Sequence, residues 1–107
     1  MAVAKRLLSG DGYAFETLSV ADSVVELTSA TYAVTNEVAH IRAFVTVDTG
    51  QLRYRYDGTN PTATVGHLAG FGDSIIIEGT VNIKNFRAIR TGDQSAKLSI
   101  TYEAIHG

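Results

Sequence analysis

Apolar and polar residues alternate along most of this chain with a period of two. The pattern is clearest in AHIRAFVTV (residues 39–47), QLRYRY (51–56) and SAKLSITYE (95–103). Successive side chains of a β-strand point to opposite faces, so this alternation is typical of strands with one buried face. The predicted buried positions of the first and third stretches are Ile41, Ala43, Val45, Val47, Ala96, Leu98, Ile100 and Tyr102.

Turn signals separate the predicted strands. Asp48-Thr49-Gly50 and Thr91-Gly92-Asp93-Gln94 predict tight connections of the hairpin kind, and Gly50 suits a positive φ. We interpret VADSVVEL (residues 20–27) as strand, turn and strand. About eight short strands in one domain predict an all-β fold, an antiparallel β-sandwich of jelly-roll-like form. The expected division is an N-terminal arm over residues 1–12 and a β-sandwich domain over residues 13–107.

Some predicted strands carry apolar residues on both faces. SIIIE (residues 74–78) does so, which predicts a strand that is central or covered, for instance by another subunit. Phe44 falls opposite the buried positions of its strand, beside Arg42. In IKNFRAIR (residues 83–90), read as a strand, Phe86 and Ala88 face one way, and Ile83 and Ile89 face the other. Two interpretations stay open: a subunit interface, or a β-bulge that buries both sets.

Composition narrows the possible chemistry. The chain has no cysteine, which excludes disulfides, thiol nucleophiles and cysteine-ligated metals. The three histidines, His40, His67 and His106, are isolated from one another, and no Gly-x-Ser-x-Gly motif is present, so we expect no metal, no cofactor and no enzymatic activity. Apolar runs are too short to cross a bilayer, and residues 1–10 lack the apolar core of an export signal.

Charge is distributed unevenly along the chain, although the net charge of −2 argues against general nucleic-acid binding. Between Arg6 and Arg42 lie five acids and no Lys or Arg: Asp11, Glu16, Asp22, Glu26 and Glu37. From Arg42 to Arg90 there are six basic residues, Arg42, Arg53, Arg55, Lys84, Arg87 and Arg90, against four acids. This asymmetry fits a subunit contact, and it equally fits two solvated faces.

The stretch LRYRYDGTNPT (residues 52–62) most resembles a binding site. A strand places its arginines and tyrosines on opposite faces, so they cannot hold one nucleotide together. The alternation instead predicts Tyr54 and Tyr56 in the core and Arg53 and Arg55 on the surface, with DGTNPT as a turn. A glycan site is weakly indicated because the chain has no Trp, but a loop site at Tyr13, Asn60 or Phe71 stays open.

The second half of the chain resembles a group of small β-sandwich structural proteins of tailed bacteriophages. The resemblance covers roughly residues 38–103. It rests on the run Arg55 to Thr62, then Gly66, the Gly72-Asp73 turn, the run Phe86-Arg87-Ala88-Ile89-Arg90, and a last strand from Leu98 to Tyr102. It implies a virion component assembled in the host cytoplasm, such as a head decoration (capsid-cementing) protein or a head–tail or tail accessory protein. The implied partners are the major capsid protein or another virion protein, and further copies of the chain, a trimer among the options.

These observations lead to one expected function and one alternative. The expected function is a non-enzymatic structural component of a phage particle, foremost a capsid decoration protein, acting through protein–protein contacts. The alternative is a carbohydrate-binding module that recognises cell-surface glycans through its loops. The expected interface residues are Lys5 and Arg6 of the arm, together with Arg42, Phe44, Arg53, Arg55 and Arg87.

Overall fold

The computed structural model describes residues 11–34 and 40–105. Within these ranges the chain forms eight strands and two short helices. In chain order they are β1 (Asp11–Val20), β2 (Val25–Glu26), α2 (Ser29–Tyr32), β3 (His40–Thr49), β4 (Gln51–Arg55), β5 (His67–Gly70), β6 (Ser74–Glu78), α3 (Thr80–Asn85), β7 (Arg87–Arg90) and β8 (Ala96–Ile105). Residues 1–10 of the expected arm lie outside the described residues, and β1 begins at Asp11.

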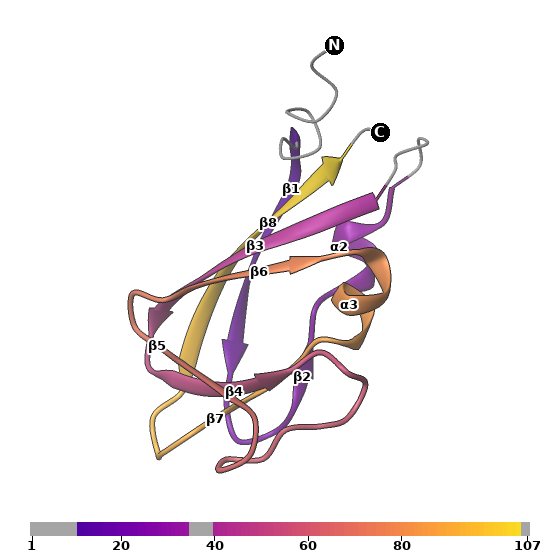
Figure 1. The fold of residues 1–107 in the computed structure, drawn as a ribbon. Helices are drawn as coiled ribbons and strands as arrows, with labels where there is room; N and C mark the ends of the chain where they lie inside the picture. Colours follow the sequence, from indigo (N-terminus) through magenta and orange to yellow (C-terminus); the bar gives the residue numbers. More distant parts are fainter. Residues whose placement is uncertain (1–10, 35–39, 106–107) are drawn as a thin grey trace.

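The strands form two antiparallel four-stranded sheets, stacked face to face (Figure 1). Sheet A has the order β1-β8-β3-β6, and sheet B has the order β2-β7-β4-β5. The pairings are nested, because β1 pairs with β8, β2 with β7, β3 with β6 and β4 with β5. Two sheets of four strands joined in this nested way are a jelly roll. The predicted all-β, jelly-roll-like sandwich with about eight strands is therefore confirmed.

The core lies between the two sheets and is filled by the alternating apolar positions. All eight positions expected to be buried in β3 and β8 are buried: Ile41, Ala43, Val45, Val47, Ala96, Leu98, Ile100 and Tyr102. Sheet B contributes Leu52, Ala69 and Ala88 from the opposite side. The strand–turn–strand interpretation of residues 20–27 is confirmed as well, since β1 ends at Val20 and β2 begins at Val25.

The short turns do not form the hairpins that the sequence predicts. The turn at Gly50 joins β3 of sheet A to β4 of sheet B, and the turn at Gly92 joins β7 of sheet B to β8 of sheet A. Gly50 does have a positive φ, of 78°. The hairpin prediction is wrong because the two strands joined by each turn belong to different sheets. A turn signal marks where a strand ends, but it does not show which sheet the next strand joins.

A short helix replaces the first half of the strand predicted over residues 83–90. α3 occupies Thr80–Asn85 and begins after Gly79, whose φ is 95°, with Ile83 N donating to Gly79 O at 3.0 Å. Ile83 is buried from the helix, and Phe86 is buried immediately after it. Apolar residues fell on both faces of the predicted strand because the backbone changes from helix to strand there, not because of a bulge.

A single carboxylate joins β1, β8 and the start of α2. Glu16 lies on the core side of β1 and accepts a hydrogen bond from Tyr102 Oη on β8 at 2.5 Å. The same carboxylate accepts bonds from Thr28 Oγ1 at 2.7 Å and from Thr28 N at 3.1 Å. Because Tyr102 is fully buried, its hydroxyl depends on this partner.

We expect Tyr102 to make the protein less stable at alkaline pH than at neutral pH. Burial, and then the hydrogen bond to Glu16, raise the pKa of the Tyr102 hydroxyl above its ordinary value. In the unfolded chain a tyrosine ionises near pH 10, so above about pH 10 the unfolded state loses a proton that the folded state keeps. The contribution of the buried Tyr102 hydroxyl to the free energy of unfolding is thus complete below about pH 10, and it is lost as the pH rises above that value.

Urea unfolding of the wild type and of Tyr102→Phe, from neutral pH to about pH 11, measures this contribution. At neutral pH the variant should lose about 1–2 kcal/mol, because Glu16 loses a donor. Above about pH 10 it should lose stability less steeply than the wild type. Identical slopes for the two proteins would contradict the assignment.

Candidate interaction surfaces

The outer face of sheet A is organised in three rows that run across its strands. Side chains in register form a hydroxyl row, an apolar row and a charged row. The hydroxyl row is Thr17, Ser99, Thr46 and Ser74; the apolar row is Phe15, Thr101, Phe44 and Ile76; the charged row is Glu103, Arg42 and Glu78. Each row takes one residue from each strand that it crosses. The polarity of the surface therefore changes along a strand and stays similar from one strand to the next.

The apolar row is exposed to solvent. Phe15 on β1 is 60% exposed, Phe44 on β3 is 39% exposed, and Ile76 on β6 is 60% exposed. Thr101 on β8 separates the two aromatic rings. Single exposed apolar residues are common on protein surfaces, whereas large ones aligned across a sheet indicate a contact surface.

The charged row pairs one cation with two carboxylates. Arg42 Nη2 lies 2.6 Å from Glu103 Oε1, and Arg42 Nε donates to the same oxygen at 2.7 Å. Arg42 Nη1 lies 3.6 Å from Glu78 Oε2. The guanidinium group is largely buried between its two carboxylates, while the Glu78 side chain stays mostly exposed. Arg42 is one of the residues expected at an interface, and its guanidinium group already pairs with carboxylates of its own sheet.

The hydroxyl row is held by Asp48 at the end of β3. Ser99 Oγ donates to Asp48 Oδ2 at 2.5 Å, and Thr46 Oγ1 lies 3.5 Å from Asp48 Oδ1. All four hydroxyl residues are uncharged and stand directly beside the apolar row. A partner that covers the apolar row would therefore meet little charge on this side of it.

The other three arginines expected at an interface lie on the outer face of sheet B. Arg53 Nη1 donates to Gly66 O at 3.0 Å, although its buried Nε has no hydrogen-bond partner. Arg55 forms a two-pronged pair with Asp57, which lowers the pKa of that carboxyl. Arg87 lies 3.6 Å from Glu26 and donates to Lys84 O at 3.0 Å. All three guanidinium groups bind within their own chain.

The tyrosines of LRYRYDGTNPT have different environments, which corrects the prediction that both are in the core. Tyr54 is half-buried on the core side of β4, with its ring 5.6 Å from that of Phe86. Tyr56 is 43% exposed and stacks on His67 with ring centroids 6.2 Å apart. The reason is that β4 ends at Arg55, so the alternation does not continue to Tyr56.

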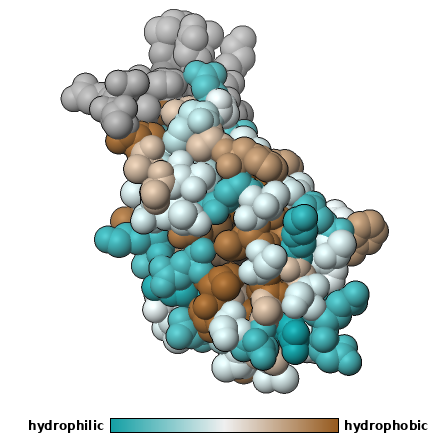
Figure 2. All heavy atoms as spheres, turned by 180° about the vertical axis from the view of Figure 1, so that it is seen from behind, coloured by the Kyte–Doolittle hydropathy of each residue, from teal (hydrophilic) through white to brown (hydrophobic). Residues whose placement is uncertain are grey.

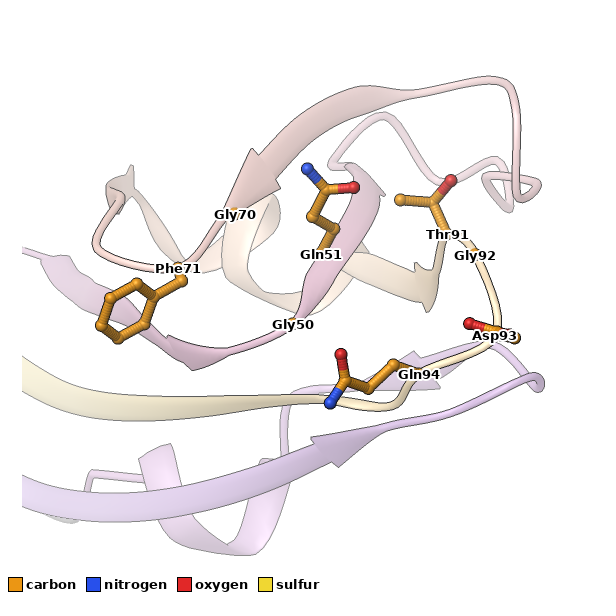
Figure 3. A pocket seen from close by; sticks show the side chains of 8 residues that line it. All are labelled: Gly50, Gln51, Gly70, Phe71, Thr91, Gly92, Asp93 and Gln94. Carbon is orange, nitrogen blue, oxygen red and sulfur yellow. The ribbon is translucent and has the colours of Figure 1, made fainter.

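An open cleft of about 540 Å³ lies at the end of the sandwich where three sheet-to-sheet turns meet. Figure 1 shows the β3–β4, β5–β6 and β7–β8 turns together on the left. The cleft is lined by Gly50, Gln51, Gly70, Phe71, Thr91, Gly92, Asp93 and Gln94. In Figure 3 the ring of Phe71 points away from the polar side chains, which stand on the other side of the cleft. The aromatic and polar groups thus do not converge on one point.

The structure divides the expected interface residues between two opposite faces. Arg42 and Phe44 lie on sheet A, whereas Arg53, Arg55 and Arg87 lie on sheet B, and Lys5 and Arg6 lie outside the described residues. Seen from behind in Figure 2, apolar side chains break the hydrophilic surface in several places. Sequence reasoning missed Phe15 and did not connect Ile76 with Phe44, because these contacts depend on register between distant strands.

Within residues 11–34 and 40–105, no group of three or more metal-ligating side chains comes together, and no helix is long and apolar enough to cross a membrane.

Comparison with known proteins gives no relative for this chain. No family model, no curated protein and no solved structure matches it.

Proposed function

We propose that this protein is a non-enzymatic structural component of a bacteriophage particle, and foremost a capsid decoration protein that binds the major capsid protein. The observation that carries the proposal is the exposed apolar row of sheet A, formed by Phe15, Phe44 and Ile76 with Thr101 between them. The resemblance of residues 38–103 to small phage structural proteins selects a virion as the setting and a virion protein as the partner.

The outer face of sheet A has the composition of a protein–protein contact. Interface cores are depleted in charge and enriched in aromatic residues, and a polar rim surrounds them. The apolar row supplies such a core, and the hydroxyl row and the internally paired charged row supply a rim on either side. Burying this face leaves the Arg42 guanidinium group paired, because it keeps its two carboxylate partners.

The fold is compatible with the proposal but does not distinguish it from the glycan-binding alternative. Jelly rolls occur in viral capsid proteins and also in lectins, and a fold alone does not define a function. The choice between a capsid contact and a glycan contact therefore rests on the surfaces. The apolar row crosses all four strands of sheet A, with Thr101 between Phe15 and Phe44. In the cleft, by contrast, Phe71 points away from the polar side chains. The sheet surface is the better supported of the two.

We expect the double variant Phe15→Ser/Phe44→Ser to lose binding to the phage particle while it keeps its fold. Central interface residues cost about 2 kcal/mol or more when truncated, which is roughly thirtyfold in affinity for each residue. Co-sedimentation with particles that lack the protein measures the affinity, and mass spectrometry of purified virions tests whether the protein is present. Leu68→Ser is the matched control, because Leu68 is 53% exposed on the outer face of sheet B.

The same samples separate the capsid contact from the glycan alternative. If the double variant binds particles as well as the wild type, sheet A is not the contact surface. If the protein is absent from virions but binds a glycan array, and Phe71→Ala abolishes that binding, the structural function is wrong and the cleft is the site.

A further inference from the structure

The two sheets have four edge strands, and only one of them lacks the features that prevent pairing with another chain. β2 has two residues, and β5 has four and ends on Gly70. β1 has a register irregularity between Gly12 and Ala14, and Glu16 points inward from it. Short strands, bulges and inward charges are the usual ways in which proteins block an edge. β6, which is Ser-Ile-Ile-Ile-Glu, pairs with β3 in continuous register and has none of these features.

Residues 74–78 were expected to form a strand that is central or covered, and the edge position of β6 excludes the first of these alternatives. Sheet A ends at β6, and within the described ranges no strand pairs with its outer side. α3 follows β6 directly and buries Ile83, but Ile76 stays 60% exposed on the outer face. A strand with three consecutive isoleucines therefore lies at a sheet edge without a cover from the described part of its own chain.

Hydrogen bonds at the ends of the β3–β6 ladder show which backbone groups of β6 face outward. Gly79 N donates to Ile41 O at 2.9 Å, and Val47 N donates to Asp73 O at 3.0 Å. Successive residues of a strand direct their backbone groups to alternate sides. The odd-numbered residues of β6 therefore bond toward β3. The backbone groups of Ser74 and Ile76, and the N–H of Glu78, face the free edge.

We propose that β6 pairs antiparallel with β6 of a second copy, about a twofold axis at Ile76. In this register Ile76 lies opposite Ile76, Ile75 opposite Ile77, and Ser74 opposite Glu78. Apolar residues meet apolar residues on both faces of the sheet, and the serine hydroxyl at each end can donate to a glutamate. Parallel pairing would place the two Glu78 carboxylates side by side, and like charges directly opposite each other destabilise a strand pair. A shift by one residue would pair the outward-facing Ile76 of one copy with a core-facing isoleucine of the other.

Residues on either side of β6 support the same partner. The two most exposed large apolar side chains of the described residues are Phe71, at 79%, and Val81, at 70%. Phe71 lies three residues before β6, and Val81 lies three residues after it. Antiparallel pairing brings the start of one β6 to the end of the other, so Phe71 of one copy approaches Val81 of the other. A twofold arrangement of this kind is the commonest symmetry of homo-oligomers.

The pairing would join sheet A of the two copies into one continuous sheet. The apolar row of each copy ends at Ile76, so the two rows would meet at the axis and run across both molecules. This inference does not rest on the proposed function, since it concerns the isolated protein. A failure to bind particles leaves it intact, and a monomeric protein leaves the particle contact through Phe15 and Phe44 open.

Cysteine crosslinking tests both the pairing and its register, because the natural chain has no cysteine. In a hydrogen-bonded antiparallel pair the Cα atoms lie about 5.5 Å apart, which is within reach of a disulfide. We expect Ile76→Cys to form a covalent dimer under mild oxidation. Ser74→Cys is the matched control on the same strand. Its two sulfurs would lie about 13 Å apart along the strands and should not crosslink within the dimer.

Sedimentation equilibrium of the unmodified protein should give twice the 11.4 kDa mass of the chain. Ile76→Lys should weaken the dimer at least roughly tenfold, because it places two like charges opposite each other at a strand edge. Leu68→Lys, a similarly exposed change on the edge strand of sheet B, should leave the dimer unchanged. A monomer at high concentration, a trimer, equal crosslinking of both cysteine variants, or pairing with a strand of another protein in place of a second copy would overturn the proposal.

Discussion

Replacing Phe86 with alanine is expected to lower the free energy of unfolding by about 4 kcal/mol, which is a large part of the total stability of a domain of this size. Phe86 has no exposed surface and lies between the end of α3 and the start of β7. Its ring stacks on that of Tyr54 with centroids 5.6 Å apart. The loss combines the hydrophobic transfer of the ring with the cavity that it leaves, since the two sheets cannot close around it.

Denaturant unfolding of Phe86→Ala and of two control variants checks this expectation. Phe71→Ala removes the same side chain from a position that is 79% exposed, and Tyr56→Ala removes a ring that is 43% exposed. Phe71→Ala should change the free energy of unfolding by no more than about 0.5 kcal/mol, and Tyr56→Ala by clearly less than Phe86→Ala. A loss in Tyr56→Ala as large as that in Phe86→Ala would restore the prediction that the Tyr56 ring is part of the core.

The sequence predicted β3 and β8, two of the three ten-residue strands, well because one physical rule controls them. β3 and β8 pair side by side in sheet A, with one face on the core and the other in water. Each strand of ten residues therefore repeats the buried–exposed alternation several times. Such a repeat is hard to mistake, and the buried positions of both strands follow from it. The same rule failed at Tyr56, since the strand ends one residue earlier and nothing in the local pattern marks that end.

The topology could not be predicted because it depends on contacts between distant parts of the chain. Gly50 and Gly92 lie in turns of similar composition, and both turns carry the chain from one sheet to the other. A tight hairpin uses the same residue types, so local chemistry does not distinguish the two outcomes. α3 was not predicted because of its length. A helix of six residues after Gly79 is too short to show a helical period.

The candidate surface was only partly visible in the sequence. Phe44 was recognised as an apolar residue on the outer side of its strand, but its neighbours come from three other strands. The register sets Phe15 and Phe44 on either side of Thr101, and sets Ile76 beside Phe44. The pairing of the arginines was not visible in the sequence either. A free arginine and one already paired with a carboxylate look identical in a sequence, and Arg42 and Arg55 are paired.

Replacing Gly50 with alanine is expected to lower the free energy of unfolding by at least about 3 kcal/mol. Gly50 has a φ of 78°, and an L-residue in that region costs roughly 1–2 kcal/mol. A Cβ atom would also lie 2.7 Å from Ser95 O and 2.8 Å from Ala96 Cα. Both are backbone atoms where β8 begins, so no side-chain rotation relieves the contact, and one of the two segments must move.

Gly92→Ala separates the two causes. Gly92 has a φ of 86°, close to that of Gly50, but no atom lies within 4 Å of the position that a Cβ would occupy. Urea unfolding of Gly92→Ala should therefore show the backbone strain alone, roughly 1–2 kcal/mol. The additional loss in Gly50→Ala then measures how closely the β3–β4 turn packs on the start of β8. Equal losses in both variants would mean that the β3–β4 turn does not pack closely on the start of β8, contrary to the short distances at Gly50.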